Sequence, residues 1–134
     1  MMPKLGDTAS VSKTISQQDI EQFAELTGDR NPMHLDPKFA EQTRFGKTIA
    51  HGMWGASLIS AVLGTKLPGP GAVYLSQTLK FQAPVYPGDT VTATAKVTKV
   101  RKDKPIVYLE TICTNQDQAV IISGEAVALV ESSD

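Results

Sequence analysis

The sequence has little cysteine, little excess charge of either sign and no long apolar run. Cys113 is the only cysteine among 134 residues, so no disulfide can form within the chain and a reducing, cytoplasmic setting is expected. The 13 basic and 14 acidic residues are spread along the chain, which argues against nucleic acid as a partner. The most apolar stretch, 49–64, is shorter than the roughly 20 residues of a bilayer span, and the chain starts without the apolar run of a signal peptide, so no membrane partner is expected.

The first half of the chain predicts one strand and three helices. Ser16 offers an N-cap oxygen for a helix that Gly28 can end, and Asp36 and Pro37 form a cap and first-turn pair for a second helix. The third helix has apolar residues around most of its circumference, so we expect burial on nearly every side. The strand is expected over 8–15, and the helices over 17–27, 38–41 and 49–63.

The second half of the chain alternates with period two and is rich in Val, Ile, Thr and Tyr, which indicates β structure. Because no helical segment intervenes, the sheet should be antiparallel, with about five strands once the first is added. Such a sheet hides an apolar helix by curling around it, which predicts an α+β hot dog fold and one domain over 1–134. Its exposed edge favours a homodimer. The later strands are expected over 72–82, 90–99, 106–115 and 119–130.

The segment GDRNPMHLDP, residues 28–37, gathers polar chemistry between two predicted helices. Because Asn31 precedes Pro32, a non-repetitive path is expected over 28–35, which can fold Asp29 and His34 toward one water molecule. A carboxylate and an imidazole suit general acid-base work. Alternatively, Asp29 and Asn31 bond the loop's own amides, and His34 is a surface or satisfied core residue.

The segment His51-Gly52-Met53 stands where the apolar helix should begin. Unpaired amides at a helix N-terminus carry about half a positive charge, so the Gly52 amide can receive a carbonyl oxygen that becomes negative. Alternatively, Gly52 serves helix packing and His51 makes an N-terminal hydrogen bond.

Other candidates are weaker. The two histidines and Cys113 match no zinc spacing, although His34 and Asp36 could join a carboxylate site, so no metal is expected. We assign Asp36 to capping, and Cys113 to a small buried side chain in a strand. The run Arg101-Lys102-Asp103-Lys104 reads as a solvated hairpin tip, or else as a docking point for the phosphates of a substrate carrier.

Several spaced segments together resemble the MaoC-like hydratase family. They are G-D-x-N-P-x-H at 28–34 within the hydratase 2 motif, H-G-M at 51–53 and F-x-x-P-V-x-x-G-D at 81–89. Nearly the whole chain is similar to the short R-specific enoyl-CoA hydratases that feed polyhydroxyalkanoate synthesis. That resemblance implies a cofactor-free homodimer that adds water to a trans-2-enoyl thioester of coenzyme A, giving the (R)-3-hydroxyacyl product.

The resemblance also implies roles for individual residues. Asp29 and His34 would be the catalytic pair, and Asn31, Gly52 and Met53 would bind substrate, with Asn31 ordering the pair and Gly52 supplying the oxyanion amide. The acyl chain would lie against the apolar helix, where bulky residues near its start favour short or medium acyl groups. The candidate wall residues are Met53, Trp54, Leu58 and Leu63.

Three other functions stay open at this point. An (R)-3-hydroxyacyl dehydratase acting on an acyl carrier protein would use the same fold and chemistry. A hot dog thioesterase would direct water to the carbonyl carbon. A non-catalytic acyl-thioester binding module would leave the D-x-N-P-x-H segment unexplained.

Overall fold

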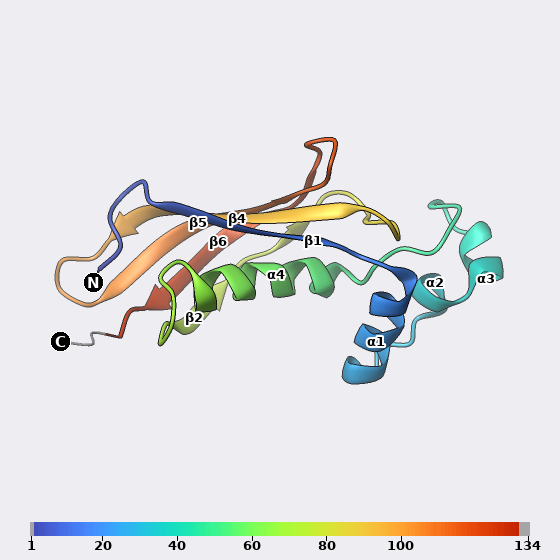
Figure 1. Cartoon of the computed structure of the whole chain (residues 1–134), viewed down its shortest axis with the longest axis horizontal. Coiled ribbons are helices and arrows are strands. Elements are labelled where there is room, and N and C mark those ends of the chain that lie inside the picture. Colours follow the sequence, from blue (N-terminus) through green and yellow to red (C-terminus); the bar gives the residue numbers. More distant parts are fainter. Residues whose placement is uncertain (1, 132–134) are drawn as a thin grey trace.

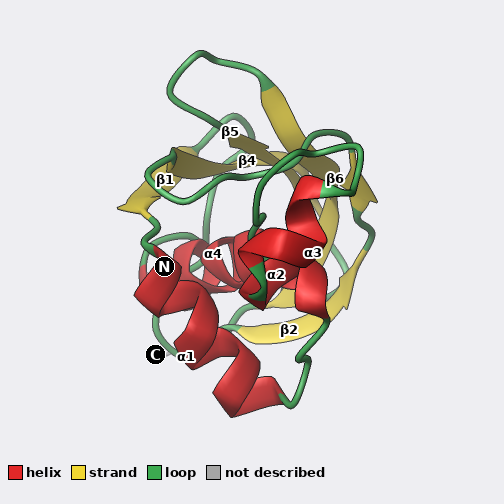
Figure 2. Cartoon of the chain, turned by 90° about the vertical axis from the view of Figure 1, so that its right-hand side faces the viewer, coloured by secondary structure: helices red, strands yellow, loops and turns green. Residues whose placement is uncertain are grey.

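One curved antiparallel sheet wraps around the helix α4 in the computed structural model, which describes residues 2–131. The sheet order is β1-β4-β5-β6-β2, and the short strand β3 also pairs with β6. Figure 1 shows α4 lying along the sheet with α1, α2 and α3 beyond one end of it, and Figure 2 shows from that end how the strands curve around the helix. The strands are β1 (Thr8–Thr14), β2 (Val73–Gln77), β3 (Lys80–Phe81), β4 (Thr90–Val100), β5 (Ile106–Thr114) and β6 (Val120–Leu129), and the helices are α1 (Gln17–Thr27), α2 (Pro32–Leu35), α3 (Pro37–Glu41) and α4 (Gly52–Thr65).

The core lies between the inward face of the sheet and α4. Alternate residues of β4 and β5 are fully buried, as a half-buried antiparallel sheet requires. Ile59 and Val62 of α4 pack against them. The predicted α+β hot dog fold is therefore confirmed. No helix among residues 2–131 is long and apolar enough to cross a membrane.

The predicted strand over 72–82 is divided in two, which gives six strands among residues 2–131 instead of about five. At the break, the Thr78 amide donates to the Glu125 carbonyl (2.9 Å), and the Glu125 amide donates to the Thr78 hydroxyl (2.9 Å). The chain approaches β6 so closely here that a Cβ on Gly124 would lie 1.9 Å from the Thr78 carbonyl oxygen. This crossing sets the position of Leu79 and Phe81, which line the two cavities described below.

The helix α4 begins three residues later than predicted. Residues 49–51 are extended because their backbone groups bond elsewhere: the Ile49 amide donates to the Met33 carbonyl (3.3 Å), and the Ala50 amide to the Val85 carbonyl (2.8 Å). Apolar periodicity alone could not reveal these distant partners. His51 is thus the N-cap residue and Gly52 the first helical residue.

One face of α4 is open, whereas the sequence predicted burial on nearly every side. Met53 is 57% exposed. Ser57, Ser60 and Gly64 continue the same stripe at helical spacing and are also exposed. The sheet covers the other faces, where Trp54 and Ile59 are buried. A single chain therefore leaves this stripe uncovered.

Substituting Gly124 tests the close crossing of the chain over β6. We expect Gly124→Ala to lower the free energy of unfolding by about 2 kcal/mol or more, because backbone has to move to admit the methyl group. Gly64→Ala is the matched control: its Cβ meets nothing within 4 Å, and alanine in a helix gains up to about 1 kcal/mol over glycine. Chemical denaturation of both variants measures the difference. Equal stabilities would contradict the crossing.

Candidate active site

The end of α1 and the short helix α2 shape the polar segment. Gly28 ends α1 with φ of +82°, and its amide donates to the Ala24 carbonyl (2.8 Å). The Asn31 side chain accepts from the Met33 amide (3.1 Å) and so caps α2, in which Pro32 is the first residue. The expectation of a non-repetitive path over 28–35 is therefore wrong for its second half, because the Asn-Pro pair starts a helical turn.

The assignment of Asp36 to capping is confirmed. Its carboxylate accepts from the amides of Lys38 (3.0 Å) and Phe39 (3.4 Å) at the start of α3. This carboxylate is exposed and satisfied by backbone. It is therefore occupied by the helix terminus.

His34 is buried on α2, and both its ring and its backbone carbonyl are held by hydrogen bonds. Its Nδ1 lies 2.7 Å from the Ile49 carbonyl oxygen. A carbonyl can only accept, so Nδ1 carries the proton and Nε2 presents a lone pair. The His34 carbonyl accepts from the Gln17 side-chain amide (3.0 Å), and Gln17 in turn accepts from the Thr48 hydroxyl (2.8 Å). The neutral imidazole is therefore fixed in one tautomer and one orientation.

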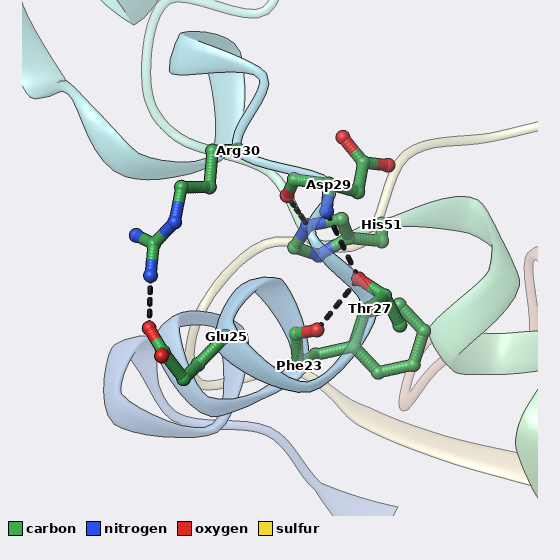
Figure 3. Close-up of polar contacts among 6 residues, drawn as sticks. All are labelled: Phe23, Glu25, Thr27, Asp29, Arg30 and His51. Atoms are coloured by element: carbon green, nitrogen blue, oxygen red, sulfur yellow. Dashed lines mark hydrogen bonds and ion pairs between the residues drawn. The ribbon is translucent and has the colours of Figure 1, made fainter.

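His51 reaches back to the polar segment and stacks on His34. Its Nε2 lies 2.9 Å from the Asp29 carbonyl oxygen and must donate to it (Figure 3). The two imidazole centroids are 3.9 Å apart, and the Phe23 ring lies 4.8 Å away on the His51 ring. The Nδ1 atom of His51 is buried and has no hydrogen-bond partner among residues 2–131. A ligand or water molecule that reached this nitrogen could therefore bond to it.

Asp29 lies beside the two histidines with its carboxylate exposed. One atom each of Asp29, His34 and His51 lies within 4.8 Å of the others, close enough for a single water to bridge carboxylate and imidazole. The same carboxylate accepts from the Asn31 amide (3.3 Å), and the Asp29 amide donates to the Thr27 hydroxyl (3.2 Å) (Figure 3). Asp29 therefore bonds its own loop, as the structural interpretation expected, and its carboxylate also lies close to His34, as the acid-base interpretation requires.

Burial lowers the pKa of His34 from its ordinary value. The loss of hydration is the largest cause and disfavours the imidazolium. The Ile49 carbonyl opposes this by accepting from Nδ1, His51 lowers the pKa further, and the Asp29 carboxylate raises it. The net shift is downward, so His34 is neutral and able to accept a proton at neutral pH.

The start of α4 supplies unpaired amides close to the histidines. Neither the Gly52 nor the Met53 amide has an acceptor among the described residues, and His51 makes no side-chain cap. A Cβ on Gly52 would lie 2.9 Å from a carbon of the Phe81 ring, so any larger residue would displace that ring. Glycine therefore lets the Phe81 ring pack closely against the start of α4.

Two cavities flank the site. The first, the histidine cavity, has a volume of about 440 Å³ and is lined by His34, His51, Gly52, Arg44, Phe45 and Phe81 among others. The second, the edge-strand cavity, has a volume of about 760 Å³ and lies between β2 and the open face of α4; its lining includes Asp29, Met53, Ser57, Ser60, Leu75 and Leu79. The predicted pair therefore stands where the two cavities approach each other.

Of the four residues predicted to form the acyl-binding wall, only one lines a cavity. Met53 lines the edge-strand cavity, but Trp54, Leu58 and Leu63 belong to the hydrophobic core and line neither cavity. Trp54 is 7% exposed. Helical periodicity identified the apolar residues of α4 but not which of them the sheet covers. Asn31 also lines neither cavity, so its visible role is to cap α2.

Asp29, His34 and His51 also form the only cluster of metal-ligand side chains among the described residues. The imidazole planes are only 30° apart at a centroid distance of 3.9 Å. Stacked rings do not direct their lone pairs to one ion at the usual distance of about 2.0 Å, so one ring would have to turn first. The arrangement as it stands suits a water molecule better than a metal ion.

Sequence reasoning missed the structural role of His51. It placed this residue at a helix start and considered only an N-terminal hydrogen bond. A usable signal was present, because a polar residue inside an apolar segment is expected to be buried and to need hydrogen-bond partners. Its contacts with Asp29 and His34 could not be read from the sequence.

The fold and the site together define a hot dog protein with a carboxylate-imidazole pair at the start of its central helix. The MaoC like domain family matches residues 4–116, and the chain belongs to this family. An (R)-specific enoyl-CoA hydratase of Rhodospirillum rubrum is 53% identical over 127 residues, covering 95% of this chain and 88% of that protein. The solved (R)-hydratase from A. caviae involved in PHA biosynthesis superimposes with a TM-score of 0.93 at 46% identity, covering 96% of this chain and 98% of that one. A mitochondrial 3-hydroxyacyl-[acyl-carrier-protein] dehydratase of Arabidopsis thaliana is more distant, at 37% identity over 98% of this chain and 80% of that protein.

The lowered pKa of His34 predicts how the site and the stability respond to pH. A nuclear magnetic resonance titration of the His34 ring should give a pKa below 6.5, and Asp29→Asn should lower that pKa further by removing the favourable carboxylate. Because unfolded His34 binds a proton more readily than folded His34, the free energy of unfolding should decrease as the pH falls below 6.5. His34→Ala should reduce this pH dependence. A ring pKa at or above 6.5 would contradict the burial argument.

Proposed function

We propose that this protein is an (R)-specific enoyl-CoA hydratase, a hydro-lyase that reversibly adds water to a trans-2-enoyl thioester. The observation that carries the proposal is the meeting of Asp29 and His34 within reach of the unpaired amides at the start of α4. The family and the 53% identical R. rubrum hydratase agree with this chemistry. No cofactor is required, because water is the only co-reactant.

The geometry supports a mechanism with one activated water. The water donates one hydrogen bond to the lone pair on His34 Nε2 and one to the Asp29 carboxylate, and its oxygen attacks the β-carbon as a proton passes to this pair. The thioester oxygen becomes enolate-like and is stabilised by the Gly52 amide. A proton returned to the α-carbon from the same side completes syn addition.

The carboxylate-imidazole pair is tested by two substitutions. We expect Asp29→Asn and His34→Ala each to lower kcat for crotonyl-CoA by at least about a hundredfold, the scale of a lost general acid or base. Loss of the conjugated thioester absorbance measures the rate, and chiral analysis of the product measures its configuration. Asp29→Asn is decisive, because the amide oxygen can still accept from Asn31.

Glu21→Gln is the matched control, because Glu21 is an exposed carboxylate on α1 and should keep full activity. Circular dichroism should be unchanged in the Asp29 variant. Unfolding of that variant, or full activity, would favour a purely structural role for the segment. Release of free thiol from a saturated acyl-CoA would instead identify a thioesterase, and faster turnover of an acyl-carrier-protein thioester would identify the dehydratase.

We further propose that two copies pair along β2. This strand is at one edge of the sheet, and its Val73, Tyr74 and Leu75 side chains are 43%, 39% and 49% exposed. The opposite edge, β1, is polar by comparison. An apolar, unpaired edge is a ready site for strand pairing, and a second copy would cover both β2 and the open stripe of α4. The edge-strand cavity would then be enclosed.

Charge at the β2 edge tests the dimer. Leu75→Lys should weaken dimerisation by about thirtyfold or more, the effect of losing an interface anchor worth about 2 kcal/mol. Ser10→Lys on β1 is the matched control and should leave the assembly unchanged. Sedimentation equilibrium over a concentration series measures both. A monomeric parent protein, or dissociation caused by the β1 substitution alone, would contradict this interface.

The cellular setting also belongs to the proposal. A reducing cytoplasmic location agrees with Cys113 being a buried free thiol. Supply of (R)-3-hydroxyacyl precursors for polyhydroxyalkanoate synthesis is supported by the A. caviae relative, which is described as involved in PHA biosynthesis.

A further inference from the structure

The two cavities at the site differ in charge. The wall of the histidine cavity includes the guanidinium-bearing residue Arg44, and Lys47 follows three residues later in the same exposed loop. The edge-strand cavity is lined by no lysine or arginine among the described residues, and its one charged lining residue is the acid Asp29. An anionic group is therefore attracted to the first cavity and repelled by the second.

The two cations are available for a ligand. The ion pairs among residues 2–131 join Arg30 with Glu25 and Arg101 with Asp103, so neither Arg44 nor Lys47 is neutralised by a carboxylate. Each lies instead over an aromatic ring.

The aromatic rings form a support beneath these cations. The Arg44 guanidinium carbon is 6.0 Å from the Phe45 ring centroid, and the Lys47 Nζ is 4.5 Å from the Tyr86 ring centroid. The Tyr86 hydroxyl donates to the Phe45 carbonyl (3.3 Å), which ties the two pairs together. Arg44 thus lines the cavity that contains Gly52, and Lys47 is tied to the neighbouring residue Phe45 through Tyr86.

We propose that Arg44 and Lys47 bind the nucleotide phosphates of the coenzyme A carrier. This inference rests on the proposed function and assigns each cavity a part of the substrate. The pantetheine arm runs through the histidine cavity, the thioester oxygen meets the Gly52 amide, and the acyl chain enters the edge-strand cavity past Asp29. Arginine suits a phosphate because its planar guanidinium donates two parallel hydrogen bonds, while lysine adds a point charge.

The alternative carrier site suggested by the sequence lies elsewhere. The loop that carries Arg101 to Lys104 joins β4 to β5 at the end of the molecule opposite α2 and α3 (Figure 1). Arg101 is already paired with Asp103. Within one chain, this loop is remote from the histidines. Its lysines can therefore be substituted as a control for Arg44 and Lys47.

The first experiment compares thioesters with and without phosphates. For the double variant Arg44→Glu, Lys47→Glu, we expect KM for crotonyl-CoA to rise at least about tenfold with kcat little changed, as for lost charge-assisted contacts. The crotonyl thioester of N-acetylcysteamine has no phosphate, so its kcat/KM should be unchanged. Lys102→Glu, Lys104→Glu is the matched control with the same charge change and should behave as the parent protein. Equal effects on both thioesters, or a KM increase only in the control, would overturn the proposal.

The second experiment separates this inference from the proposed function. Calorimetry with free coenzyme A needs no turnover, and the Arg44, Lys47 double variant should bind it at least about tenfold more weakly than the parent. If the parent binds coenzyme A through these residues but hydrates no thioester, the proposed function fails and the carrier site stands. If the double variant hydrates crotonyl-CoA normally and loses only an acyl-carrier-protein thioester, the carrier site is wrong.

Discussion

The site depends above all on the hydrogen bond between His34 Nδ1 and the Ile49 carbonyl. This bond, 2.7 Å long, fixes the imidazole tautomer and so leaves the lone pair on Nε2. It also requires residues 49–51 to stay extended, because the Ile49 carbonyl would otherwise accept within a helix. As a result α4 starts only at Gly52, and its first amides remain unpaired. One backbone carbonyl therefore orients the His34 ring and leaves the unpaired amides of α4 close to it.

The two stacked imidazole rings hold this arrangement together. Their centroids are 3.9 Å apart, and the His51 ring also packs against Phe23. Burial is the largest cause of the lowered pKa of His34, and the neighbouring His51 lowers that pKa further. His51 contributes by holding the Asp29 backbone, which keeps the carboxylate near His34.

The sequence predicted the fold and the meeting of Asp29 with His34 because both depend on local patterns. Each of the signals used depends on residues that are close together in the sequence. These signals are the period-two alternation, the caps at Ser16 and Asp36, and the turn at the Asn-Pro pair. Features that depend on partners distant in the chain were missed or misplaced. Gly124 admits the crossing near Thr78, and Val85 and Met33 delay the start of α4. The burial of Trp54 was missed for the same reason, because it depends on how far the distant strands of the sheet curl around α4.

Under the proposed function, with the acyl chain in the edge-strand cavity, the open face of α4 changes which residues would limit acyl chain length. Trp54 lies in the core and cannot end the edge-strand cavity, whose helical wall has the small residues Ser57 and Ser60. The bulkier walls come from Leu75 and Leu79 on and after β2. In a dimer paired along β2, the depth of this cavity would depend on how closely the second copy approaches the strand. Each methylene of the acyl chain gains about 0.8 kcal/mol of binding free energy only where the cavity still has room to bury it. Chain-length preference is then set by the dimer interface and by the crossing near Thr78, and not by the buried side of α4.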